Sequence, residues 1–332
     1  MKILVITVYN SFNFGAFLQA FAMYKYLTNQ GHKVDFLCME KHDFVFHKNY
    51  YKTKNPIRFF KRFITEKSFN KDIKLINSID SVESSYDLAI IGSDELWNVV
   101  NNGFEHKPEY IGYNISAKNI ITYAVSCNKT TVKDFNMHYK YDDVFSKLTA
   151  ISVRDRMTEK LVKELASNIN PIKVLDPTFL YDFSANRNRI NKKYVLLYGY
   201  SFLDDEVVKI KEYSRKMNLP IYSVGFEHKW CDKYINCGPI EFLDYIYSSD
   251  AVITATFHGS VFSIIFEKPF ASFGRDNLKV LDLLDTFELD DKNASRYGIS
   301  EILSSKFDWV NVKNIRNDKK LISENFLKEY IC

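Results

Sequence analysis

The sequence predicts an α/β fold of two domains, each built around a buried parallel sheet. Short runs of branched apolar residues alternate with stretches of helical periodicity along most of the chain, which is typical of βαβ units. The runs are apolar throughout, as expected for strands that are covered on both faces. A chain of 332 residues also exceeds the usual size of one hydrophobic core. We therefore expect two Rossmann-like domains that face each other across a cleft.

The first domain is predicted to cover residues 1–185. Its expected strands are residues 2–8, 33–37, 88–91, 120–125 and 150–153. Its expected helices are residues 16–28, 57–64, 67–79 and 157–166. The turn after the first strand lacks the G-x-G-x-x-G pattern, so no NAD site is predicted.

The second domain is predicted to cover residues 186–315 and begins with the polar stretch Asn186 to Lys192. Its expected strands are residues 194–198, 220–224, 251–253 and 270–273. Its expected helices are residues 204–217, 241–247, 258–266 and 278–284. A last amphipathic helix, about 318–330, lies in the C-terminal segment 316–332 and is expected to cross back onto the first domain.

Composition excludes several classes of protein. The formal charge of +4 is small and spread along the chain, so nucleic acid is not an expected partner. Five cysteines without a C-x-x-C pair argue against a disulfide framework and a structural zinc site. The sequence carries no signal-peptide core and no 18-residue apolar span, so we expect a cytoplasmic protein. It does not indicate an oligomeric state.

One stretch mixes basic and aromatic residues. It could be a solvated helix face, or it could contact an anionic polymer or the inner face of a membrane. Its members are Arg58, Phe59, Phe60, Lys61, Arg62, Phe63 and Lys67.

The stretch from Asp250 to Phe273 combines a buried strand, a polar turn, an apolar helix and a second strand. His258 stands where the helix begins, after the strand's carboxyl end. Helix N-termini at this edge of a parallel sheet offer N–H groups and a partial positive charge to anions. His258 is therefore a candidate functional residue, with a capping or core histidine as the alternative.

Other landmarks lie at predicted strand ends in a fixed order. They are Asn13 to Ala20, Tyr86 to Trp97, Ile121 to Ser126, Ser152 to Asp155 and Leu175 to Leu180. Together with the stretch around His258, they resemble the polysaccharide pyruvyl transferase family. The resemblance covers roughly residues 1 to 290 and implies a GT-B-like architecture of two facing Rossmann-like domains.

The resemblance implies transfer of pyruvate from phosphoenolpyruvate to two hydroxyls of a sugar, giving a cyclic ketal and phosphate. The acceptor would be a sugar of a cell-surface polysaccharide, such as an exopolysaccharide or capsule, or of its lipid-linked precursor. This reaction requires a proton donor, a base for the hydroxyls and cations for the donor's anionic groups. It requires no metal or cofactor, and the strand ends offer no metal-ligand spacing.

The resemblance also implies roles for particular residues. His258 would transfer a proton or contact phosphate, with the N–H groups of Gly259 and Ser260 beside it. Asp94 would be the acceptor base. The remaining substrate-binding candidates are Arg154, Arg275, Thr256, Asn13, Gly15, Gln19 and Trp97. Trp97 could form a wall for the acceptor sugar.

Two of these roles have alternatives. Arg154 could instead form a salt bridge to Asp155 or Asp176. Some family members carry Arg where this chain has Thr256, so the cation must come from Arg154, Arg275 or Lys268, or the donor must differ. The alternative functions are a GT-B-type glycosyltransferase with a nucleotide-sugar donor and a non-catalytic glycan-binding protein.

Overall fold

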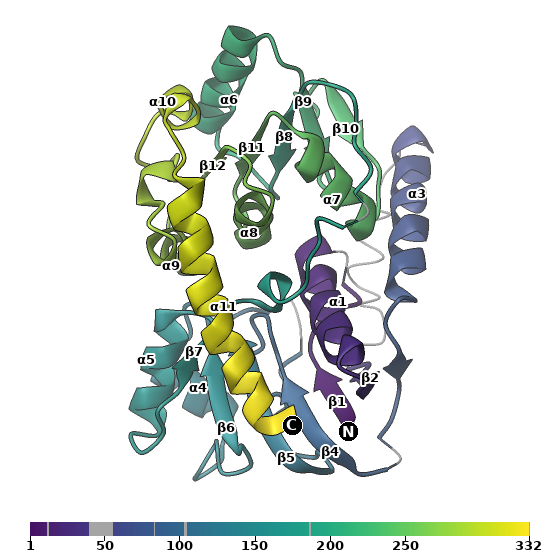
Figure 1. The fold of residues 1–332 in the computed structure, drawn as a ribbon, viewed down its shortest axis with the longest axis vertical. Coiled ribbons are helices and arrows are strands. Elements are labelled where there is room, and N and C mark those ends of the chain that lie inside the picture. Colours follow the sequence, from purple (N-terminus) through teal and green to yellow (C-terminus); the bar gives the residue numbers. More distant parts are fainter. Residues whose placement is uncertain (12, 40–55, 83, 103–104, 186, 332) are drawn as a thin grey trace. The chain divides into compact units, whose positions relative to one another are not determined.

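The computed structural model describes residues 1–11, 13–39, 56–82, 84–102, 105–185 and 187–331 (Figure 1). The chain forms two compact units, each an α/β unit around a parallel sheet, as the sequence predicts. The first unit comprises residues 1–44, 73–181 and 316–332. The second comprises residues 45–72 and 182–315.

The first unit contains a seven-stranded sheet in the order β3-β2-β1-β4-β5-β6-β7. Its strands are β1 (Lys2–Ile6), β2 (Lys33–Leu37), β3 (Ser78–Ile79), β4 (Tyr86–Ile91), β5 (Ala117–Val125), β6 (Ala150–Val153) and β7 (Ile172–Lys173). Every pairing in it is parallel, and Ile3 of β1 pairs with both Val34 and Leu88. The strand order therefore reverses between β1 and β4, which is the Rossmann-type arrangement.

Helices of the first unit connect these strands and cover the sheet. They are α1 (Phe14–Asn29), α4 (Val132–His138), α5 (Arg156–Leu165) and the part of α11 (Trp309–Ile331) that begins at residue 316. The C-terminal part of α11 packs on the unit through Phe326, whose ring centroid lies 6.4 Å from that of Tyr123 in β5. The hydroxyl of Ser323 also accepts from the N–H of Leu175 at 2.9 Å.

The second unit contains a five-stranded sheet in the order β10-β9-β8-β11-β12, again with parallel pairings. Its strands are β8 (Val195–Tyr198), β9 (Ile221–Val224), β10 (Lys233–Ile235), β11 (Ala251–Thr254) and β12 (Phe270–Ser272). Its helices are α3 (Pro56–Ile73), α6 (Asp204–Met217), α7 (Pro239–Ser248), α8 (Phe257–Ile265), α9 (Leu278–Thr286) and α10 (Ile299–Ser304). The order reverses between β8 and β11, so the second unit repeats the topology of the first.

The segment before β3 differs from expectation. We predict two helices, at 57–64 and 67–79, whereas the structure has the single helix α3 from Pro56 to Ile73. Neither glycine nor proline separates the two predicted helices, and Thr65 and Glu66 are tolerated inside a helix. The chain leaves the helix before residue 79 because Ser78 and Ile79 pair with β2 at the edge of the sheet.

Within the described part of the chain, the helices are too short or too polar to cross a lipid bilayer.

Candidate functional site

Gln19 joins the loops that follow β1 and β4. Its side-chain NH2 donates to Oγ1 of Thr7 and to the carbonyl of Val8, both at 3.0 Å, and its carbonyl accepts from Oγ of Ser93 at 3.0 Å. These loops follow the two strands between which the strand order reverses, where Rossmann-type units bind ligands. Gln19 is fully buried, so it holds the two loops together and does not offer its amide to a substrate.

Arg154 follows β6, and its guanidinium has carboxylates on two sides. Nη1 donates to Oδ2 of Asp176 at 2.8 Å, and Nη2 lies 3.6 Å from Oδ1 of Asp94. The side chains of Arg154 and Asp176 are 2% and 0% exposed, whereas that of Asp94 is 16% exposed. A buried charge without a partner costs several kcal/mol, so each member of the pair needs the other. Of the two roles that the sequence leaves open for Arg154, the structure displays the ion pair with Asp176.

The charge of Arg154 is stabilised by these neighbours. Burial alone would lower the pKa of its guanidinium, but the negative charges of Asp176 and Asp94 outweigh burial and raise that pKa. Asp176 in turn accepts at Oδ1 from the N–H and the hydroxyl of Thr178, at 3.1 and 2.8 Å. The Asp-Pro-Thr landmark therefore builds a buried, hydrogen-bonded counter-ion for Arg154.

Asp94 is the most accessible carboxylate of this group. Its backbone is left-handed, with φ of 80°, and its carbonyl accepts from the N–H of Ser126 at 2.9 Å. The neighbouring Glu95 has a different role, because its carboxylate accepts from the side-chain amides of Asn98 at 2.6 Å and Asn128 at 3.2 Å. Glu95 thus stabilises the turn, and Asp94 is the carboxylate that a substrate could reach.

Two other predicted substrate contacts lie elsewhere. Trp97 is fully buried; its indole N–H donates to the carbonyl of Tyr110 at 2.7 Å, and its ring stacks on Phe145 with centroids 5.1 Å apart. The prediction that Trp97 forms a wall for a sugar is therefore corrected, because a ring inside the core has no face to offer. Asn13 caps α1, where its side chain accepts from the N–H of Gly15 at 3.0 Å.

In the second unit, hydroxyl groups organise the turn from β11 into α8. Oγ1 of Thr256 caps the helix by accepting from the N–H of Gly259 at 2.9 Å. Oγ1 of Thr254 donates to the carbonyl of Tyr198 at 2.7 Å and lies 3.1 Å from Oγ1 of Thr256. A Cβ at position 259 would collide with Thr254 and Thr256, so only glycine lets α8 approach β11 this closely.

His258 is the second residue of α8 and is 7% exposed. Its ring stands nearly perpendicular to that of Phe257, at 87° and 5.2 Å between centroids. We expect the N–H groups of Gly259 and Ser260 to donate to phosphate oxygens. In the structure, the N–H of Gly259 donates to the hydroxyl of Thr256 at 2.9 Å, and the N–H of Ser260 donates to its carbonyl at 3.3 Å. The cap therefore uses the Gly259 donor, and the first hydrogen bond within α8 uses that of Ser260.

Arg275 follows β12 and forms a two-pronged ion pair with Glu206, the third residue of α6. Nε donates to Oε1 of Glu206 at 2.8 Å, and Nη2 donates to Oε2 of the same carboxylate and to the carbonyl of Ser201. The hydrogen bonds to Glu206, together with its charge, raise the pKa of Arg275. The Arg275 side chain is 30% exposed, so unlike Arg154 it could also reach a ligand.

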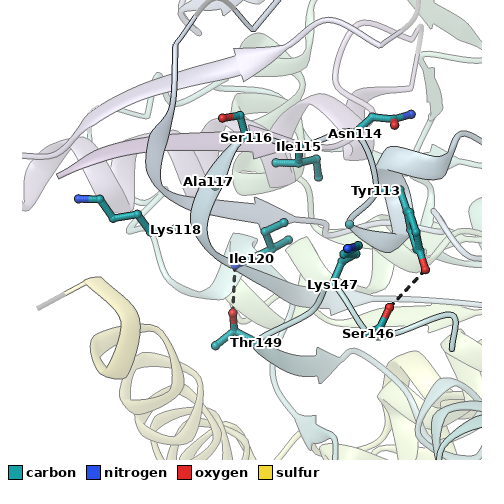
Figure 2. A pocket seen from close by; sticks show the side chains of 11 residues that line it. Tyr113, Asn114, Ile115, Ser116, Ala117, Lys118, Ile120, Ser146, Lys147 and Thr149 are labelled. Carbon is teal, nitrogen blue, oxygen red and sulfur yellow. Dashed lines mark hydrogen bonds between the residues drawn. The ribbon is translucent and has the colours of Figure 1, made fainter.

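A hollow of about 630 Å³ lies at the amino end of β5, whereas Asp94 lies beside the carboxyl end of the same strand (Figure 2). Tyr113, Ser116, Lys118 and Lys147 are among its lining residues, and it surrounds the start of β5. Val125, at the other end of β5, pairs with Asp94. Eight residue steps along a strand span about 26 Å, so this hollow is separate from the predicted site.

Among the residues that the structure describes, no group of three or more His, Cys, Asp or Glu side chains is placed to hold a metal ion. The first βα turn, from Tyr9 to Gly15, contains a single glycine, so it also lacks the sequence of a dinucleotide-phosphate loop.

Sequence reasoning missed three residues that position this machinery. Ser93 bonds Gln19 and lies 3.4 Å from Asp176; Thr254 supports the α8 cap; Glu206 holds Arg275. A local signal existed for Glu206, since it is the third residue of α6 and accepts from the N–H of Leu203 at 2.9 Å, as capping residues do. Its pairing with Arg275 has no local signal.

Two Rossmann-type units, each with polar groups at its strand ends, define a class of two-domain α/β folds that glycosyltransferases and a sugar epimerase also adopt. Within that class, the polysaccharide pyruvyl transferase family model matches residues 13–277. The chain belongs to the polysaccharide pyruvyl transferase family. It is therefore a transferase of polysaccharide biosynthesis with a sugar or polysaccharide acceptor.

Solved structures support the fold at low sequence identity. The UDP-GlcNAc 2-epimerase of Methanocaldococcus jannaschii is similar with a TM-score of 0.51 and 10% identity, over 96% of this chain and 99% of that one. The glycotransferase of kitacinnamycin has a TM-score of 0.52 and 10% identity, over 100% and 99%. The spinosyn forosaminyltransferase SpnP has a TM-score of 0.51 and 10% identity, also over 100% and 99%. Searching the curated proteins finds no match to the sequence.

Proposed function

We propose that this protein transfers pyruvate from phosphoenolpyruvate onto two hydroxyls of one sugar, in a cell-surface polysaccharide or its lipid-linked precursor. The observation that carries the proposal is the family match over residues 13–277. It includes the strand ends with Asp94 and Arg154 in the first unit, and His258 and Arg275 in the second. The donor supplies its own leaving group, so the reaction needs no bound cofactor.

The chemistry balances without a further reactant. A proton adds to the methylene carbon of phosphoenolpyruvate, and the adjacent carbon becomes an oxocarbenium-like centre. One sugar hydroxyl attacks that carbon, the bond to the phosphate oxygen breaks with its electron pair, and the second hydroxyl closes the ketal. Of the two hydroxyl protons, one replaces the proton delivered to the methyl group and the other leaves with phosphate. The protein must therefore supply an acid, a base and anion contacts.

In the first unit, Asp94 is the residue that we assign as base for the acceptor hydroxyls. Its carboxylate is 16% exposed and lies 3.6 Å from Arg154, which is itself held by Asp176. This arrangement orients the Asp94 carboxylate while leaving an oxygen accessible. Arg154 would then act chiefly on the acceptor side, by positioning Asp94, because its own guanidinium is already between two carboxylates.

In the second unit, we assign proton transfer to His258 and contact with the donor's carboxylate or phosphate to Arg275. His258 is in the first turn of α8, where the helix dipole favours an anion, and Thr256 fixes that turn. Arg275 is preorganised by Glu206 and retains exposed guanidinium surface. A planar guanidinium with one edge exposed suits a carboxylate or phosphate.

Donor binding tests the proposal directly. Isothermal calorimetry of the purified protein with phosphoenolpyruvate should give a measurable Kd, whereas UDP-GlcNAc and other nucleotide sugars should give none. Binding of a nucleotide sugar instead would favour the glycosyltransferase alternative, which shares this fold. Binding of neither donor, together with binding of polysaccharide, would favour the non-catalytic alternative.

A further inference from the structure

Helix α3 of the second unit presents an apolar and basic face to solvent. Phe60, Phe63 and Ile64 are 62%, 50% and 40% exposed, and Lys67 and Lys71 are exposed as well. The spacing of these five residues places them on one side of the helix. We call this set the α3 outer face.

The opposite side of α3 anchors the helix in the second unit. Phe69 and Thr65 are 1% and 3% exposed, and the carboxylate of Asp72 accepts from the N–H of Ile240 at 3.0 Å. Figure 1 shows α3 beside α7 and β10 of the same unit. The side chains of Arg58 and Lys61, which belong to the predicted basic and aromatic stretch, lie outside those described. The outer face is thus the side of α3 that points away from its anchoring contacts.

We propose that the α3 outer face binds an anionic membrane surface, with Phe60, Phe63 and Ile64 at the headgroup–acyl boundary and Lys67 and Lys71 on the lipid phosphates. Helices that lie in the plane of a membrane combine an apolar face with lysines at its margin. Each lysine adds electrostatic attraction to an anionic surface that falls off within a Debye length, about 10 Å at 0.1 M salt. This inference rests on the residues of α3 and is independent of the proposed reaction.

Two other occupants fit the face less well. A hydrated acidic polymer would use the lysines but would leave two phenylalanines and an isoleucine in water. A second copy packed through the same face would bring Lys67 and Lys71 against, or close beside, the same two lysines of the other copy. The α3 outer face contains no acidic residue to neutralise these charges. A lipid surface uses both the apolar and the basic members.

Vesicle sedimentation tests the proposal on the full chain. Phosphatidylcholine vesicles with and without about one third phosphatidylglycerol are mixed with protein, and the bound fraction is measured against lipid concentration. The double variant Phe60→Gln/Phe63→Gln should bind anionic vesicles about 10- to 100-fold more weakly, because two rings no longer leave water. Lys67→Gln/Lys71→Gln should bind anionic vesicles about 30-fold more weakly and neutral vesicles as the wild type does.

The matched control is Val208→Gln/Val310→Gln, which removes two exposed apolar side chains, 54% and 74% exposed, from α6 and α11. It should bind as the wild type does. Wild-type protein that stays in the supernatant with anionic vesicles overturns the proposal, as does equal binding by the Phe60→Gln/Phe63→Gln variant. Binding to soluble alginate but not to vesicles would assign the face to an acidic polymer. If the wild type is a dimer that does not bind vesicles, and Phe60→Gln/Phe63→Gln dissociates that dimer, the α3 outer face would be a contact with a second copy.

Discussion

The two units share one topology but hold their candidate residues in different ways. In the first unit, Arg154 and Asp176 form a buried ion pair at the strand ends. In the second unit, the corresponding edge is built from the hydroxyls of Thr254 and Thr256 around the start of α8, with Gly259 packed against them. Buried ions therefore stabilise the strand ends of one sheet, and neutral helix caps stabilise those of the other.

Because of this difference, the candidate residues of the first unit also stabilise its fold, whereas those of the second unit do so less. Removing one partner of a buried ion pair leaves the other charged and unpaired, so function and folding in the first unit are coupled. In the second unit Thr256 makes the cap of α8, so an exchange of His258 leaves that cap in place. We therefore expect the second unit to tolerate changes at its candidate catalytic residue better than the first.

The largest effect should follow from changing His258. His258→Ala should lower turnover by about 100- to 10,000-fold, the usual range for loss of a general acid, while the melting temperature changes little. Phosphate release with acceptor present, compared with thermal melts of the same preparation, measures both. His258→Gln is the control for lost volume. A destabilised variant with near-normal turnover per folded molecule would make His258 a core residue.

Asp176→Asn or Arg154→Met should destabilise the protein by about 3–5 kcal/mol, because each removes one partner of a buried ion pair. In Asp176→Asn the guanidinium keeps Asp94, 3.6 Å away, so that cost should lie at the lower end of the range. Urea unfolding gives the difference. The double variant Arg154→Met/Asp176→Leu should recover part of it, since no charge remains buried. Lys163→Gln is the control: it breaks the exposed pair with Glu159 and should cost less than about 0.5 kcal/mol. A cost below about 1 kcal/mol for Asp176→Asn would contradict the ion-pair interpretation.

Changing Arg275 tests whether this exposed arginine binds the donor, in contrast to Arg154, which is buried in an ion pair. Arg275→Ala should weaken phosphoenolpyruvate binding by roughly 10- to 100-fold, because a charge-assisted hydrogen bond contributes about 1.5–3 kcal/mol. Arg275→Lys should recover only part of the affinity, since an ammonium cannot bind in two-pronged fashion. Calorimetry provides the Kd. Unchanged affinity would leave Arg275 as the partner of Glu206 alone.

Gly259→Ala should destabilise by about 1–3 kcal/mol, because the added methyl group collides with Thr254 and Thr256. Thr256→Ala should cost about 1 kcal/mol through the lost cap. Gly298 is the steric control, since a Cβ there meets nothing closer than 3.9 Å; it is the N-cap of α10, so Gly298→Ala should cost less than about 1 kcal/mol. Thermal unfolding ranks the three, and equal values would remove the steric argument for Gly259.

The smallest effect concerns Glu241, which has the carboxylates of Asp244 and Asp72 near it. Burial, together with the nearby charges of Asp244 and Asp72, raises the pKa of Glu241. When folding raises the pKa of a carboxyl, the free energy of unfolding falls as the pH rises from the pKa of that group in the unfolded chain to its pKa in the folded protein. Glu241→Gln should therefore stabilise by less than about 1 kcal/mol at pH 7 and lose that advantage near pH 4. Stabilisation that grows toward acid would reverse the sign and contradict the assignment.

Local pattern was sufficient for most elements of both sheets. Apolar runs such as Ile3–Ile6 and Ala251–Ile253 are found as buried strands, and Gly259 ends up where the helix approaches a strand. The two-residue strands β3 and β7 were missed because two residues carry no periodicity. That the two units form a cleft lined by the candidate residues stays a prediction.

The sequence by itself determined most of the buried strands and the family, because each depends on residues close together in the chain or on an ordered set of motifs. Only the tertiary structure decided that Arg154 pairs with Asp176, 22 residues away, and Arg275 with Glu206, 69 residues away. It also decided that Trp97 lies in the core. The order of the strands and the packing of the helices determine these contacts. The residues near Arg154 or Arg275 in the sequence do not indicate which distant carboxylate will lie beside it.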